Sequence, residues 1–146
     1  MAQNKILIDS SAYLQLARQH HPLLGVEFGK ENNCLYIIDD LKRELNATSR
    51  LQLPFAWLNE HEYRHNRVKT VQVSREDYQQ VSTSLEAIRE RARTERLPIV
   101  AVDAEILAHG QVLGLPVVSG DPNVRALAEN LKIVVWTVEK LQLTAR

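Results

Sequence analysis

Four acidic residues spread along the chain are the first candidates for chemistry, and two of them follow apolar runs. Asp9 follows Lys5–Ile8, and Asp121 comes after the segment Pro116–Ser119. Both runs have the length and composition of buried strands. The carboxyl ends of parallel strands meet at one edge of a sheet, where ligand sites tend to form. If the sheet is parallel, both aspartates are therefore expected to face that same edge.

The other two acids, Asp103 and Glu44, belong to predicted helices. Asp103 opens a helix over about Val102–Leu113, and the loop before it must return to the same edge. Glu44 lies in a helix after the apolar run Leu35–Ile38, so its side chain is expected to project inward from the flank. Repelling carboxylates are costly to assemble unless a cation joins them. Hard oxygen ligands without histidine or cysteine favour Mg²⁺ or Mn²⁺, and such a site suits phosphodiester hydrolysis.

Each of these acids also has a purely structural interpretation. Asp9 and Asp103 could cap the helices that they precede or open. Asp121 followed by Pro122 is a favourable pair for the start of a helix. Glu44 could be a solvated surface residue. The joint arrangement, with two acids at strand ends and two on helices, is what favours a shared metal site.

The elements that must position these acids alternate between strand and helix. Asp39 and Asp40 are good caps for a helix that ends at about Asn46. The stretch His20–Cys34 contains proline and glycines and is predicted to be a loop. Further strands are expected at Lys69–Val73 and Lys132–Trp136, and further helices from Ser10, over 54–66, from Ser74 and over Pro122–Asn130. This order predicts an α/β fold, a three-layer α/β/α sandwich with a central, mainly parallel sheet.

The helix after Ser74 carries the strongest local signals. Ser74 precedes Asp77 by three residues, which has the form of a capping box. Apolar residues recur behind it at helical spacing and predict one buried stripe; they are Tyr78, Val81, Leu85, Ile88 and Ala92. The later helix that carries Asp103 is expected to end at Gly114, which would adopt the left-handed conformation.

Size and composition indicate a single domain over residues 1–146. The chain is 45% hydrophobic and 25% charged, which are globular values. No apolar run approaches the length needed to cross a bilayer, and the start of the chain lacks the pattern of a signal peptide. Cys34 is alone, which rules out an internal disulfide and predicts a cytoplasmic protein.

Charge is balanced overall but unevenly distributed. The 18 basic and 18 acidic residues give a net charge of zero, which argues against a strong nucleic-acid binder. Residues 42–75 nevertheless carry seven basic residues against three acidic ones. Since this segment includes Glu44, it is the preferred candidate for RNA contact, through Lys42, Arg43 and Arg50.

With these motifs in place, the chain resembles the PIN-domain nucleases. The resemblance extends from residue 5 to about residue 136 and preserves the order Asp, Glu, Asp, Asp that this family uses to bind metal. The segments that carry it are Ile6-Leu7-Ile8-Asp9-Ser10-Ser11, Leu41-Lys42-Arg43-Glu44-Leu45, Val102-Asp103-Ala104-Glu105-Ile106-Leu107-Ala108 and Leu115-Pro116-Val117-Val118-Ser119-Gly120-Asp121.

The resemblance implies roles for individual residues. Asp9, Glu44, Asp103 and Asp121 would be the metal-binding acids. Ser119 occupies the place of a supporting hydroxyl residue, and Ser10 matches the small hydroxyl residue that commonly follows the first aspartate. Where many members have a further acid, this chain has Asn123, whose amide binds hard metals more weakly, so occupancy of a second metal is in question.

The resemblance also implies activity and partners. It implies an endoribonuclease that uses Mg²⁺ or Mn²⁺, often the toxin of a bacterial toxin–antitoxin pair and often a homodimer. In toxin members of the family, a segment of the antitoxin covers the active site.

Two alternative functions stay open. His61, Glu62 and His65 match the H-E-x-x-H pattern of zinc peptidases. Polar flanking residues, the cation of Arg64 and the lack of a clear third ligand count against this function, although Glu86 is a formal candidate. The chain could also be a non-catalytic PIN-like module that binds RNA or a protein, but retention of all four acids argues against it.

Overall fold

The computed structural model describes residues 3–18, 27–47 and 69–145. These residues form a five-stranded sheet in the order β3-β2-β1-β4-β5, with every neighbouring pair parallel. The strands are β1 (Asn4–Ile8), β2 (Asn33–Ile37), β3 (Lys69–Thr70), β4 (Val117–Val118) and β5 (Val135–Trp136). The predicted parallel sheet is therefore confirmed, with a shorter β3 and β5 than expected.

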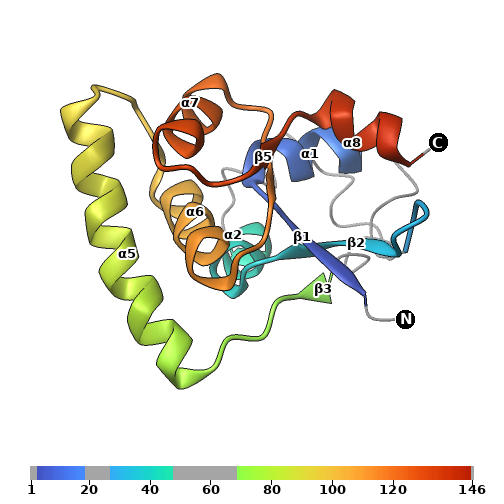
Figure 1. Cartoon of the computed structure of the whole chain (residues 1–146), viewed down its shortest axis with the longest axis horizontal. Coiled ribbons are helices and arrows are strands. Elements are labelled where there is room, and N and C mark those ends of the chain that lie inside the picture. The colour runs from blue at the N-terminus through green and yellow to red at the C-terminus, as the bar shows by residue number, and fades with distance from the viewer. Residues whose placement is uncertain (1–2, 19–26, 48–68, 146) are drawn as a thin grey trace.

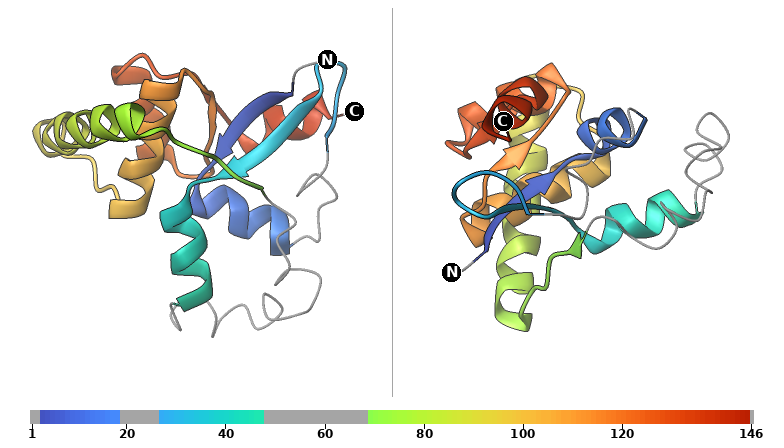
Figure 2. Two further views of the ribbon diagram at one scale, coloured as in Figure 1. Left: turned by 90° about the horizontal axis from the view of Figure 1, so that it is seen from below. Right: turned by 90° about the vertical axis from the view of Figure 1, so that its right-hand side faces the viewer.

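Helices flank the sheet and complete the predicted three-layer α/β/α sandwich (Figures 1 and 2). The longest helix, α5, packs along α6 at the outside of the molecule. The helices are α1 (Ser10–Arg18), α2 (Asp39–Ala47), α5 (Arg75–Thr94), α6 (Ala101–Leu113), α7 (Pro122–Asn130) and α8 (Val138–Thr144). The predicted helix over 54–66 lies outside the described residues.

The strand order places a topological switch point between β1 and β4. From β1 the chain moves to β2 and β3 on one side, and it later returns to β4 and β5 on the other. Leu7 pairs with Val117 and Ile8 with Val118, so these two strands end in register. Crevices at such points, beyond the carboxyl ends of the strands, are the usual ligand sites of open parallel sheets.

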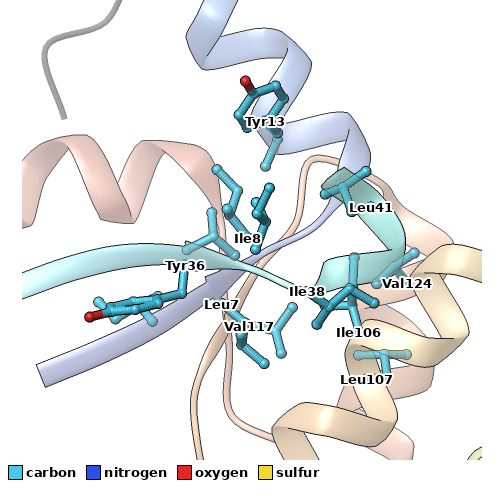
Figure 3. Packing of buried hydrophobic residues seen from close by; sticks show 14 of the residues in the cluster. Leu7, Ile8, Tyr13, Tyr36, Ile38, Leu41, Ile106, Leu107, Val117 and Val124 are labelled. Atoms are coloured by element: carbon cyan, nitrogen blue, oxygen red, sulfur yellow. The ribbon is translucent and has the colours of Figure 1, made fainter. Parts of the chain in front are cut away.

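The core lies on both faces of β1, whose last three side chains are fully buried. Figure 3 shows Ile8 on the side of Tyr13 from α1, whereas Leu7 and Val117 lie on the other side of the sheet. Alternate residues of a strand point to opposite faces, which explains why a strand covered on both faces is apolar throughout. Because these side chains hold β1 and β4 firmly, the turns that follow both strands have a rigid base.

Local signals placed the helix ends correctly. Ser74 is the N-cap of α5, and its hydroxyl oxygen accepts a hydrogen bond from the Asp77 N–H at 3.1 Å. Gly114 ends α6 with φ of 68°, the left-handed conformation expected there. Thr137 caps α8 in the same way as Ser74 caps α5, but the sequence analysis did not predict this last helix.

The predicted buried stripe of α5 needs one correction. Val81, Ile88 and Ala92 are buried and Leu85 is half-buried, but Tyr78 is 58% exposed. The Tyr78 ring instead lines a surface pocket together with His109 of α6.

Candidate metal centre

Asp9 follows β1 directly and is completely buried. Its main-chain N–H donates to the Val118 carbonyl at 3.0 Å, which fixes the residue beside β4. Its Oδ1 accepts from the Ala12 N–H at 2.9 Å and thereby caps α1. Its Oδ2 is buried and has no hydrogen-bond partner among the described residues. The structural role proposed for Asp9 is thus real, but it occupies only one of the two oxygens.

Asp103 lies in the first turn of α6 but does not cap it. The N-cap position is Val100, which makes no side-chain cap bond. The Asp103 carboxylate turns instead to the start of α1, where its Oδ1 accepts from the Ser10 hydroxyl at 2.8 Å and, more weakly, from the Ser10 N–H at 3.4 Å. The capping interpretation of Asp103 is therefore wrong, and Ser10 positions this carboxylate.

Asp121 follows β4 through a tight turn and caps α7. Its Oδ1 accepts from the Asn123 N–H at 2.8 Å, so Asn123 contributes its main chain to this contact. The Ser119 hydroxyl accepts from the Asp121 N–H at 3.0 Å. Arg125, a residue not singled out from the sequence, donates from Nη1 to the Ser119 carbonyl at 3.1 Å. Asp121 is half-buried, so its second oxygen remains available for a ligand.

The three aspartates influence one another electrostatically. Burial raises the pKa of Asp103 to about 6, and the charges of Asp9 and Asp121 contribute to the rise. Burial also raises the pKa of Asp9. The Ser119 hydroxyl, the Ala12 N–H and the Ser11 hydroxyl oppose this rise, and the charge of Asp121 adds to it. Buried carboxylates that raise one another's pKa destabilise the folded protein. Such clusters are therefore typical of functional sites, where the chemistry requires them.

Ser11 links the two turns, a role that the sequence analysis missed. Its hydroxyl donates to Asp9 Oδ1 at 3.0 Å and accepts from the Gly120 N–H at 3.2 Å. Gly120 approaches α1 closely, since an added Cβ would lie 3.3 Å from the Ser11 hydroxyl oxygen and from Gln15 Oε1. Ser11 therefore sets the spacing between the turns that carry Asp9 and Asp121. The sequence signal was the second hydroxyl residue after Asp9, on the first turn of a helix.

Glu44 stands in a different group of charges. It is half-buried on α2 and raises the pKa of Glu105, two residues beyond Asp103 on α6. Burial is the main cause of that rise, while the cations of Arg89 and Arg43 oppose it. Hydrogen bonds and mutual charge effects thus connect Asp9, Asp103 and Asp121, while the charge of Glu44 acts on Glu105. Glu44 as a fourth metal ligand stays a prediction.

The residues expected to contact RNA have mixed outcomes. Arg43 is exposed but forms ion pairs with Asp39, at 3.6 Å, and with Asp40, so part of its charge is already neutralised. Lys42 is half-buried on the same helix. Arg50 lies outside the described residues, as do His61, Glu62 and His65 of the zinc-peptidase pattern.

The ligand chemistry of the aspartate cluster fits a hard divalent cation. Its carboxylates are oxygen donors, and the buried Oδ2 of Asp9 lacks the partner that a buried anionic oxygen normally has. As the side chains lie, however, no three acidic, histidine or cysteine residues in the described parts of the chain are arranged to hold one ion. Mg²⁺ is commonly held by one or two carboxylates together with water and substrate phosphate, so three protein ligands are not required.

Comparison with solved structures identifies the class of fold. No family model matches the chain, and no curated protein matches it in sequence. FitAcB from Neisseria gonorrhoeae matches with 16% identity and a TM-score of 0.52, over 92% of this chain and 98% of that one. VapBC-1 from nontypeable Haemophilus influenzae matches with 12% identity and a TM-score of 0.60, over the same shares. VapBC2 from Rickettsia felis, bound to a DNA fragment from its promoter, matches with 12% identity and a TM-score of 0.61, over 91% and 98%.

Independently of any activity, the chain shares the PIN-like α/β/α fold of these solved structures. At these identities the likeness concerns the fold and does not identify catalytic residues. It favours neither the zinc-peptidase function nor the non-catalytic module. Within the described residues, no helix combines the length and apolar character needed to span a membrane.

Proposed function

We propose that this protein is a metal-dependent endoribonuclease that uses the aspartate cluster at the switch point. Asp9, Asp103 and Asp121 would hold Mg²⁺ or Mn²⁺, with Glu44 as a further acid at the flank. When bound, such a cation lowers the pKa of an attacking water and stabilises charge on the leaving oxygen. The PIN-like fold shared with toxin–antitoxin complexes supports this choice of reaction.

The chain's own residues prepare the site in two ways. Ser10 donates to Oδ1 of Asp103, and Ser11 donates to Oδ1 of Asp9. In the proposed site, the second oxygen of each carboxylate would bind the cation. Ser119 and Arg125 hold the turn before Asp121 and keep its carboxylate beyond the sheet edge. Positioning acids in advance lowers the cost of assembling them around the reacting phosphate.

The single observation that carries the proposal is Asp9 Oδ2. This oxygen is buried and can only accept, and no described residue makes a geometrically regular hydrogen bond to it, although the Ser119 hydroxyl lies close enough to lower the pKa of the carboxyl. A buried anionic oxygen in this position is costly. A cation between Asp9 and its acidic neighbours would compensate for that cost and for their mutual repulsion. A purely structural capping role explains Oδ1 and leaves Oδ2 without a function.

The decisive test compares RNA cleavage by the wild-type protein and by Asp9→Asn, each with Mn²⁺ and with EDTA. Asparagine is a good N-cap, so the variant keeps the bond to the Ala12 N–H while it loses the charge. Mn²⁺-dependent cleavage should fall to background in Asp9→Asn. Glu129→Gln, a change at an exposed acid on α7, is the matched control and should cleave like the wild type. Equal cleavage by Asp9→Asn and wild type would refute the proposal.

The partners of this reaction are proposals of the same kind. The toxin–antitoxin neighbours support an antitoxin that restrains the enzyme. RNA as the substrate and a homodimer as the active form would be tested by cleavage assays and by sedimentation of the purified chain.

A further inference from the structure

A pocket of about 400 Å³ lies at the same edge of the sheet as the aspartates, one strand further along. It is lined by the start of α2, the segment after β3, the first turn of α5 and α6, with Asp40, Arg43, Gln72, Val73, Tyr78 and His109 among its residues. Both α2 and the segment after β3 begin at the carboxyl ends of their strands, as do the turns of Asp9 and Asp121. The pocket therefore faces the same side as the cluster.

The α6 helix connects the pocket to the aspartates. Asp103 and His109 are six residues apart on it, which corresponds to about 9 Å along the helix axis at about 1.5 Å per residue. At about 3.4 Å per nucleotide along a stacked strand, this distance corresponds to about two to three nucleotides. A strand with its phosphate at the aspartates could thus place a base a few nucleotides away in the pocket.

Tyr78 supplies an aromatic surface for such a base. Its side chain is 58% exposed and lines the pocket. Its apolar neighbour in the pocket is Val73, which is half-buried. Exposed aromatic rings beside a pocket are the usual stacking platforms for unpaired bases.

His109 supplies a hydrogen-bond acceptor. It is 6% exposed, and its Nδ1 lies 2.7 Å from the Glu105 carbonyl oxygen, which can only accept a hydrogen bond. Nδ1 therefore carries the proton, and burial lowers the pKa of the ring so that it stays neutral. Nε2 is then left as an acceptor. Carboxylates of the pocket, such as Asp40, are acceptors too, so the pocket suits a base that presents N–H donors.

We propose that this pocket binds a base of the RNA substrate that carries an exocyclic amino group, with Tyr78 stacking on the base and His109 Nε2 accepting from the amino group. The inference rests on the proposed function, because the substrate is taken to be RNA. Adenine and cytosine present such an amino donor, whereas uracil does not.

The test measures binding without cleavage. Fluorescence anisotropy of labelled oligoadenylate and oligouridylate would be recorded with the full-length protein in EDTA. Tyr78→Ala should weaken oligoadenylate binding about tenfold, the loss expected for one stacked base, and Tyr78→Phe should restore it. Leu143→Ala removes an equally exposed apolar side chain outside the pocket and should bind like the wild type. His109→Phe should reduce the preference for oligoadenylate over oligouridylate about fivefold.

Unchanged affinity in Tyr78→Ala would overturn the proposal and leave the pocket to a protein partner. An equal loss in Leu143→Ala would overturn it as well, since the effect would not be specific to the pocket. The readout is independent of the nuclease: if Asp9→Asn cleaved like the wild type while Tyr78→Ala weakened binding, the base pocket would stand and the metal site would fail.

Discussion

Replacing Asp103 by asparagine should stabilise the metal-free protein, although it removes a residue of the candidate site. In the folded chain the pKa of Asp103 rises from the ordinary value of 3.8 to about 6, chiefly because the group is buried. Each pKa unit corresponds to about 1.4 kcal/mol, so the ionised carboxylate costs the fold about 3 kcal/mol. Asparagine keeps the oxygen that accepts from Ser10 and removes the charge. Its buried amide N–H offsets about 1 kcal/mol of the gain, which leaves about 2 kcal/mol.

The sign of the pH dependence follows from the raised pKa. Below pH 3.8 the Asp103 carboxyl is protonated in both the folded and the unfolded chain. Burial of this group then carries no cost of ionisation, and the folded protein has its full stability relative to the ionised form. This contribution to stability is lost as the pH rises through about 6, because the unfolded chain releases its proton first. About half of the cost should appear between pH 5 and pH 8. The advantage of Asp103→Asn over wild type should therefore grow over this range.

The assay is urea denaturation in EDTA at both pH values, with Glu129→Gln as the exposed control. Repeating it with Mn²⁺ should reverse the order, since a cation bound to the native state stabilises the wild type and not the variant. A variant that is no more stable than wild type at pH 8, or whose advantage does not grow with pH, would refute the electrostatic account of the site.

Two further predictions concern the supports of the site. Ser11→Ala breaks the link between Asp9 and Gly120, so we expect a loss of about 1 kcal/mol in urea denaturation and weaker Mn²⁺ affinity, with Ser11→Thr restoring both. Unchanged Mn²⁺ affinity in Ser11→Ala would show that this bridge does not position the acids. Leu7→Ala removes a fully buried side chain from the strand that ends at Asp9 and should cost about 2–5 kcal/mol in the same assay. A loss below 1 kcal/mol would mean that β1 is not the rigid base inferred from its packing.

Local patterns in the sequence were sufficient for the fold class. Apolar runs such as Leu35–Ile38 and the alternation of strands with helices predicted the parallel sheet. The strand order was not predicted and comes from the structure. Ser74, Gly114 and the pair Asp121-Pro122 marked helix ends correctly. These signals work because capping and periodicity involve residues within about four positions of each other.

The tertiary structure decided how the site is assembled. The hydrogen bond from Ser10 to Asp103 joins residues 93 positions apart, and the one from Gly120 to Ser11 spans 109. Packing of α6 against the sheet edge produces the first contact, and pairing of β1 with β4 produces the second. The sequence around Asp9 shows two hydroxyl residues but does not indicate which distant segments they contact. The effect of the Glu44 charge on Glu105 was equally hidden, because it depends on how α2 and α6 approach each other.

Tyr78 illustrates the same division within a single helix. Its spacing correctly assigned it to the apolar face of α5, since periodicity determines which side of a helix a residue occupies. Whether that face is covered depends on what packs against it, and Tyr78 stays 58% exposed at a pocket that it lines with His109. The sequence by itself thus determined the elements and the faces that they present. Tertiary packing decided which of those faces meet, because contacts between distant segments depend on the relative placement of whole elements.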